Sequence, residues 1–278
     1  MTAVVLALCS AALWGTGDFL GGLSTRTLNV LIVLFWSQLV GLLGVAVWIG
    51  VSGAARPGAV LLWAVAAGLS AAVGLGCLYR GMAVGAMGIV APISATSPIV
   101  PLAVSVVGGD APTTVQWVGI AFALAGIVLV SREPGGIGPR PRVAEGVGLA
   151  LVAALGFGLF LVGMAEAAQE STPWAITTAR FSSVFALLLV LAATRTVPRV
   201  PRRLVVPVIA VGIFDTGANV LFGFAATHGP LGVVAVLSSL YPLATILLAR
   251  AVLHERLGPT RTAGGLVALG GAALIAAG

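Results

Sequence analysis

The chain has 278 residues, of which 59% are hydrophobic and only 8% are charged, and its mean hydropathy is +1.15. A soluble domain carries about 25% charged residues, so this composition excludes a soluble fold and predicts a multi-pass protein of the cell (inner) membrane. The net charge is +6, but all 14 basic residues are arginines in or near short connections between apolar runs, except one. This pattern excludes a nucleic-acid-binding role and indicates determinants of membrane topology.

Ten apolar runs of about 20 residues, the length that crosses a bilayer, follow one another along the chain. They cover residues 2–22, 28–50, 59–80, 84–107 and 114–131, and then 145–168, 173–194, 204–226, 230–252 and 259–277. Turn-forming sequences such as Arg56-Pro57-Gly58 and Leu257-Gly258-Pro259 separate them. The expected fold class is an all-α integral membrane protein with ten transmembrane helices. A cleaved signal peptide is the alternative for the first run, but no positive charge precedes it.

The sequence nearly repeats itself at a spacing of 144 residues. Residues 88–98 read Gly-Ile-Val-Ala-Pro-Ile-Ser-Ala-Thr-Ser-Pro, and residues 232–242 read Gly-Val-Val-Ala-Val-Leu-Ser-Ser-Leu-Tyr-Pro. We therefore expect two five-helix repeats, 1–131 and 145–278, joined by a cytoplasmic linker at 132–144 that is rich in Pro, Gly and Arg. A repeat of five spans starts its second copy from the opposite face, which predicts inverted repeats of the kind that build secondary transporters.

The arginines fall on one side of this ten-span arrangement. Arg56 is the exception, and it shares the other side with Asp110, Glu166 and Glu170. By the positive-inside rule the arginine-rich side is cytoplasmic, which places both termini outside.

Polar side chains inside the spans are costly in lipid and are the candidate site residues. Arg180 lies about 10 Å below the outer boundary of its span at 1.5 Å per residue. Asp215 and Asn219 lie at a compatible depth, and with Phe222 they share one helix face that we expect to line a central cavity. The alternative for Arg180 and Asp215 is a buried ion pair that only locks two helices together.

The first two spans add further candidates for the substrate pathway. Trp14 and Asp18 share a helix face, and Asp18 is either a solvated carboxylate near the helix end or a proton or cation site. Trp36 aligns with Arg180 across the repeats and stands beside Gln38; it either stacks on a substrate or only packs. For proton coupling we expect Asp215 to be the better candidate and Asp18 the weaker one.

Aromatic and glycine positions also match between the repeats. Tyr79 matches Phe222, which suggests either aromatic gating or anchoring at the membrane interface. Gly119 and Gly126 match Gly264 and Gly271, two turns apart on the fifth and tenth spans, which suits close helix packing at a seam between the halves.

No enzyme signature is present in the sequence. His228 and His254 lack ligand partners at metal spacing, no phosphate-binding loop or nucleophile elbow occurs, and Cys9 and Cys77 lie within apolar runs. We therefore expect no enzyme activity, no cofactor, no metal and no nucleic-acid partner, but the lipid bilayer and a small-molecule substrate.

Several sequence blocks resemble the EamA family of the drug/metabolite transporter superfamily. They are Ala12-Leu-Trp-Gly15, Tyr79-Arg-Gly-Met-Ala-Val-Gly-Ala-Met-Gly-Ile-Val-Ala-Pro92, Arg180-Phe181 and His254-Glu-Arg-Leu-Gly-Pro-Thr-Arg-Thr-Ala-Gly-Gly265. The first repeat departs from the pattern, with Gly109-Asp110-Ala111 in place of the His-Glu-Arg run. The resemblance implies a carrier of amino acids, other metabolites or drugs, commonly an exporter.

Three function classes follow from these observations. The leading hypothesis is a secondary transporter that moves a small metabolite or drug by alternating access. The second is a lipid-carrier translocase or an accessory membrane subunit, and the third is an integral-membrane enzyme, for which the sequence offers no catalytic constellation.

Overall fold

A computed structural model describes residues 1–54, 57–58, 61–84, 90, 93–131, 143–253 and 258–278. Helices are the only regular secondary structure in this part of the chain, which confirms the all-α prediction. Six helical stretches there are long and apolar enough to cross a membrane, one of which, Leu231–Leu253, is interrupted, and two shorter apolar helices cover Thr114–Leu129 and Thr262–Ala277. The count of ten spans stays a prediction, because span four includes residues outside the described part.

The helices follow the predicted runs closely. They are α1 (Thr2–Thr25), α2 (Val30–Ser52), α3 (Leu61–Val84), α5 (Ile99–Val107), α6 (Thr114–Ser131), α7 (Val143–Ala193), α8 (Arg202–Ala226), α9 (Leu231–Ser238), α10 (Tyr241–Leu253) and α11 (Pro259–Ala277). Of the linker predicted at 132–144, residues 132–142 lie outside the described part of the chain.

Local chemistry sets several helix ends. The side chain of Asn29 caps α2 by accepting a hydrogen bond from the backbone N–H of Leu31, at 2.9 Å. Gly53 ends α2 with φ of 62°, a left-handed conformation that glycine adopts without strain. The long α7 contains two predicted spans, and the backbone leaves the helical region between them at Ser171, just before Thr172 and Pro173.

Two predicted spans are not continuous helices. The run 230–252 divides into α9 and α10 at Ser239 and Leu240, and in the run 84–107 the turn at residues 95–98 precedes α5. The two interruptions are equivalent at the 144-residue spacing, and each stands at a proline, which cannot donate a backbone hydrogen bond: Pro98 ends the first turn, and Pro242 is the second residue of α10. Broken helices in corresponding halves are a common feature of transporters.

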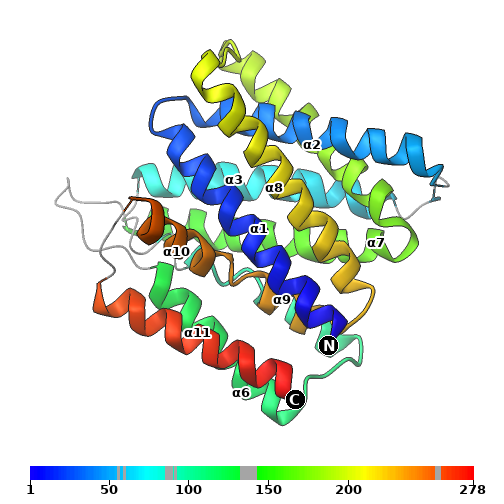
Figure 1. Ribbon diagram of the computed structural model, residues 1–278, viewed down its shortest axis with the longest axis vertical. Helices are drawn as coiled ribbons and strands as arrows, with labels where there is room; N and C mark the ends of the chain where they lie inside the picture. The colour runs from blue at the N-terminus through cyan, green and yellow to red at the C-terminus, as the bar shows by residue number, and fades with distance from the viewer. Residues whose placement is uncertain (55–56, 59–60, 85–89, 91–92, 132–142, 254–257) are drawn as a thin grey trace.

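Helices of the first half pack mainly on helices of the second half. The principal pairs are α1 with α8, α3 with α7, α2 with α7, α5 with α9, and α6 with α11. In Figure 1, α1 and α8 run side by side, α6 and α11 form a separate pair at one edge, and both termini lie at the same end of the molecule. Helices of both halves therefore build the core together.

The glycine seam predicted between the fifth and tenth spans is present in part. A Cβ atom on Gly119 would lie 2.8 Å from the backbone oxygen of Gly271, and one on Gly126 would lie 2.6 Å from Cβ of Ala268. The backbones of α6 and α11 therefore approach closely only because these positions have no side chain.

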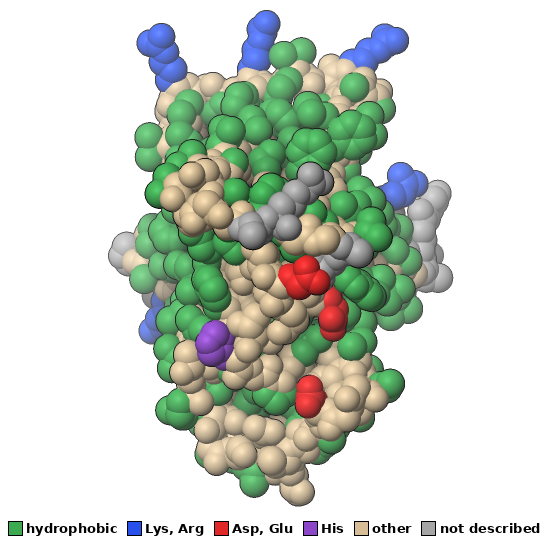
Figure 2. All heavy atoms as spheres, turned by 90° about the vertical axis from the view of Figure 1, so that its right-hand side faces the viewer, with side chains coloured by type: hydrophobic (Ala, Val, Ile, Leu, Met, Phe, Trp, Pro, Cys, Tyr) green, Lys and Arg blue, Asp and Glu red, His purple; other side chains and the backbone are tan. Residues whose placement is uncertain are grey.

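Charged side chains are separated on the molecular surface. Figure 2 shows acidic side chains and a histidine on the middle and lower part of one face, while basic side chains project from its upper edge and from its left and right margins. Glu166, Glu170, Asp110 and His228 are all exposed. Exposed apolar side chains such as Leu43, Val47 and Phe181 cover much of the remaining surface, as expected for contact with lipid.

Candidate functional site

A cavity of about 490 Å³ lies between helices of both halves. Its walls come from α1, α2, α3, α7, α8 and α10, together with Ser97 from the turn before α5 and Ser239 from the break before α10. The charged or amide side chains that line it are Asp18, Gln38, Arg180, Asp215 and Asn219, and the aromatic ones are Trp14, Phe157, Phe160 and Tyr241. Its volume lies within the range of about 300–1,000 Å³ that is typical of small-molecule sites.

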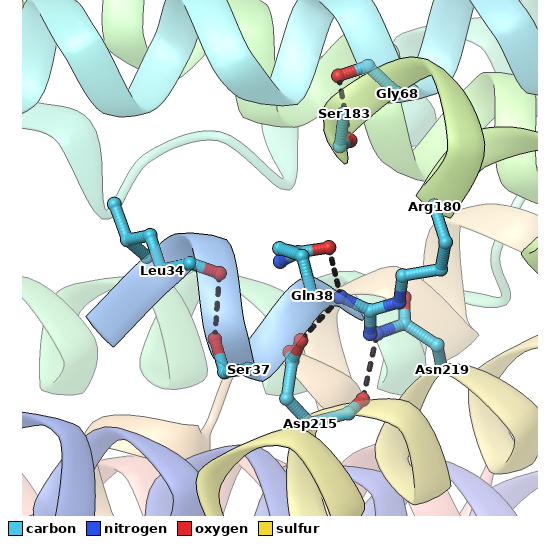
Figure 3. A network of polar contacts seen from close by, with 8 residues as sticks. All are labelled: Leu34, Ser37, Gln38, Gly68, Arg180, Ser183, Asp215 and Asn219. Atoms are coloured by element: carbon cyan, nitrogen blue, oxygen red, sulfur yellow. Dashed lines mark hydrogen bonds and ion pairs between the residues drawn. The ribbon is translucent and has the colours of Figure 1, made fainter. Parts of the chain in front are cut away.

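An ion pair joins α7 to α8 at one wall of the cavity. Nη1 of Arg180 lies 2.6 Å from Oδ2 of Asp215 and also donates to Oε1 of Gln38 on α2. Figure 3 shows the Arg180 side chain reaching from α7 towards Gln38, Asp215 and Asn219. The amide of Asn219 donates to the backbone oxygen of Asp215 at 2.7 Å, one helical turn away. Three helices therefore meet at one guanidinium group.

The guanidinium of Arg180 is largely covered by protein. The side chain is only 6% exposed, and its Nη2 has neither accessible surface nor a hydrogen-bond partner among the described residues. Gly41 on α2 lies beside it, where a Cβ atom would be in ordinary contact, 3.5 Å, with Nε of Arg180 but would collide with Oγ1 of Thr216. Close by, the hydroxyl of Ser183 donates to the backbone oxygen of Gly68 at 3.0 Å and holds α7 against α3 (Figure 3).

Asp18 has a different environment from Asp215. It lines the cavity, its side chain is exposed there, and α1 continues for two further turns to Thr25. Asp18 is therefore not at the helix end, where the solvated alternative placed it. No ion pair or hydrogen bond to its carboxylate occurs among the described residues. At the preceding residue α1 packs on α8, where a Cβ atom on Gly17 would be in ordinary contact, 3.5 Å, with the backbone nitrogen of Asp215.

Aromatic rings lie beside the cavity on the side of α1 nearer the N-terminus. The ring centre of Trp14 lies 5.8 Å from that of Phe222 and 6.4 Å from that of Tyr241. Phe222 is completely buried, which does not fit an interfacial anchor. We call Trp14, Phe222 and Tyr241 the aromatic cluster.

Trp36 and Phe222 are not among the described residues that line the cavity. Nε1 of Trp36 donates to the backbone oxygen of Pro198 at 2.8 Å, so this indole fastens α2 to the connection between α7 and α8. Tyr79 belongs to α3, but its side chain lies outside the described residues.

The structure adds cavity residues that the sequence did not single out. Phe157, Phe160, Ser183 and Tyr241 all line the cavity. The repeated break before Pro98 and Pro242 was the available signal for Tyr241, whereas Phe157 and Phe160 lie in a run that is apolar on all sides. Within the described ranges, no group of three or more His, Cys, Asp or Glu side chains is placed to hold a metal ion.

Comparison with known proteins identifies the family. The chain matches the EamA-like transporter family over residues 1–132 and again over residues 144–277. It belongs to that family. The EamA assignment confirms the resemblance stated from the sequence and makes the chain a multi-pass membrane transporter of the drug/metabolite transporter type.

A solved structure titled only "Crystal structure of protein" shares the fold. It is 20% identical, has a TM-score of 0.78, and the alignment covers 98% of this chain and 95% of that one. At this identity the likeness concerns the fold alone. The search of curated proteins found no match.

Proposed function

We propose that this EamA protein is a secondary transporter that exports a small organic metabolite or drug across the cell membrane by alternating access. The observation that carries the proposal is the cavity itself. Both halves contribute polar side chains to it, and such groups are costly in a membrane unless they serve a pathway or a packing contact.

The cavity extends towards the connection between α1 and α2. Gly22 and Thr25 at the end of α1 and Val30 at the start of α2 all line it. This connection contains Arg26 and lies on the arginine-rich side, which we infer to be cytoplasmic. A cavity that opens there would load its substrate from the cytoplasm, as an exporter requires.

The aromatic cluster supports closure at the opposite end. Trp14 lies one turn from Asp18 in the direction of the N-terminus, and Phe222 lies about one turn beyond Asn219 along α8. Trp14 and Phe222 therefore both lie farther from the α1–α2 connection than Asp18 and Asn219 do. In an inverted-repeat carrier, the pair α1–α8 is closely packed in one state and the pair α3–α7 in the other. Separation of α1 from α8 would therefore open this end of the cavity.

Filling the cavity tests the proposal. Gly22 lines the cavity and a Cβ atom on it meets no atom within 4 Å, so Gly22→Trp is the variant designed to place an indole in the cavity opening. Gly44 on α2 is also free of neighbours within 4 Å but lies outside the cavity, which makes Gly44→Trp the matched control. Radiolabelled metabolites loaded into vesicles containing only the purified chain should show saturable flux with Gly44→Trp and none with Gly22→Trp.

The same experiment distinguishes a carrier from the two alternative functions. A lipid-carrier translocase or an accessory subunit would give no saturable flux of water-soluble metabolites from the purified chain alone. Equal flux from both tryptophan variants would also contradict the assignment of the cavity as the pathway.

A further inference from the structure

The charges that face the cavity are not balanced. In the described part of the chain, the acidic and basic side chains that line it are those of Arg180, Asp215 and Asp18. Tyr241 adds a phenol. Arg180 and Asp215 neutralise each other at 2.6 Å. Asp18 therefore leaves one negative charge in the cavity when it is ionised.

Arg180 is poorly placed to receive an anion in this conformation. Its Nη1 is already engaged by Asp215 and Gln38, and its Nη2 has no accessible surface. An anionic substrate would have to break the ion pair and would also face Asp18. Breaking a buried ion pair opposes binding, because Asp215 would lose its counter-ion when the anion took its place at Arg180.

Asp18 has what a cation site needs. Its carboxylate is accessible from the cavity and has no cationic side chain paired with it among the described residues. A carboxylate surrounded by protein and lipid gains more from a nearby cation than one in water, because the local dielectric is lower. The groups that face it from neighbouring helices are Asp215 on α8, Tyr241 on α10 and Arg180 on α7, and Arg180 is already paired.

The rest of the cavity wall suits an aromatic or apolar group. Trp14, one turn from Asp18 on α1, and Tyr241 line the cavity with their ring centres 6.4 Å apart, and Phe157 and Phe160 line the wall that α7 forms. The faces of Trp and Tyr rings attract organic cations electrostatically. These rings would hold the apolar part of a ligand whose charged end meets Asp18.

We propose that the substrate of this transporter is an organic cation, a protonated amine or quaternary ammonium that carries an aromatic or apolar group, and that Asp18 binds its positive charge. This inference rests on the proposed function for its physiological meaning, but binding can be measured without transport. A proton competes with the cation for the same carboxylate, so only one of them is bound at a time.

Binding of a matched pair of probes tests the inference. Phenyltrimethylammonium keeps its charge at every pH, and phenylacetate is an anion of similar size. Titration calorimetry on the purified protein in detergent should detect binding of phenyltrimethylammonium and none of phenylacetate. The affinity for the cation should fall as the pH is lowered, because Asp18 then binds a proton while the probe does not titrate.

Variants of Asp18 complete the test. Asp18→Asn should weaken binding of phenyltrimethylammonium by about tenfold or more, as expected for the loss of a charge pair away from bulk water. Asp18→Glu keeps the charge and should retain binding, which guards against a simple folding defect. Asp110→Asn, an exposed carboxylate in the connection before α6, is the matched control and should bind like the unmutated protein.

Each outcome bears on one proposal. Tighter binding of phenylacetate, unchanged cation affinity in Asp18→Asn, or no binding of the cation would overturn the cation inference, even if vesicles still transported another metabolite. Cation binding that depends on Asp18 without any flux through vesicles would support the inference and overturn the proposed transport function.

Discussion

Asp215 and Asp18 lie on adjacent helices and face the same cavity, yet their surroundings differ in kind. Asp215 is tied to Arg180 and lies beside Asn219, and its side chain is 27% exposed. Asp18 has no such partner among the described residues and opens to the cavity. A carboxylate at membrane depth can therefore be a structural ion-pair partner or a free binding group, and its neighbours decide which.

This comparison reverses our preference for the coupling residue. From the sequence, Asp215 was the better candidate because of its depth. In the fold, protonation of Asp215 would leave the buried guanidinium of Arg180 without its counter-ion, which is costly. We now propose Asp18 as the group that exchanges protons, because its protonation strands no cation.

Arg180→Ala should have the largest effect on stability. It leaves Asp215 partly buried without its cation and removes the partner of Gln38, for an expected loss of about 3–5 kcal/mol. Thermal unfolding in detergent should show a large fall in the midpoint, and Arg180→Ala combined with Asp215→Ala should recover part of it. If Arg180→Ala alone is as stable as the unmutated protein, the ion pair with Asp215 is not a structural contact.

Gly126→Ala should have an intermediate effect. Its Cβ atom would lie 2.5 Å from the backbone nitrogen of Ala268, so α6 and α11 must move apart, at an expected cost of about 1–3 kcal/mol. Gly270→Ala on α11 meets no neighbour within 4 Å and is the matched control, without loss of stability.

This seam lies away from both carboxylates, which makes it a test of specificity. Gly126→Ala should lower the unfolding midpoint but leave the preference for phenyltrimethylammonium over phenylacetate unchanged. A change in that preference would show that stability and recognition are not separable. The distinction between Asp215 as a structural ion-pair partner and Asp18 as a binding group would then not hold.

Trp36→Phe should have a small effect. The change removes one hydrogen bond, from Nε1 to the backbone oxygen of Pro198, worth about 0.5–1.5 kcal/mol, and keeps an aromatic ring. Saturable flux in vesicles should have the same Michaelis constant as the unmutated protein. A several-fold increase in that constant would return Trp36 to the substrate pathway, where the sequence had placed it.

The helices were predictable because long apolar runs and proline-glycine breaks are local properties of the sequence. The close approach of α6 and α11 was also visible, in Gly119, Gly126 and Gly271. The interruptions at Ser239 and before Pro98 were missed because the surrounding residues are apolar enough to continue a span, although both breaks fall at repeated prolines.

The site was predictable only as a set of unusual residues. The depth of each residue in its predicted span indicated that Arg180, Asp215 and Asn219 are neighbours, as they are in the fold. Depth does not tell which side chains are paired. The inward face of α7 could not be read from the sequence, because apolar residues surround this helix and Phe157 and Phe160 do not differ from lipid-facing positions by type. The role of Trp36 depended on a distant backbone oxygen, that of Pro198.

The most direct test of the account is flux of phenyltrimethylammonium into vesicles that contain the purified protein, driven by a pH gradient. The permanently charged probe does not follow the gradient through the lipid by itself. The account predicts gradient-driven accumulation by the unmutated protein and by Asp110→Asn, and none by Asp18→Asn, although Asp18→Asn should unfold near the unmutated midpoint. Gradient-driven accumulation that survives in Asp18→Asn would contradict the central claim that Asp18 is the free, proton-exchanging carboxylate of the cavity.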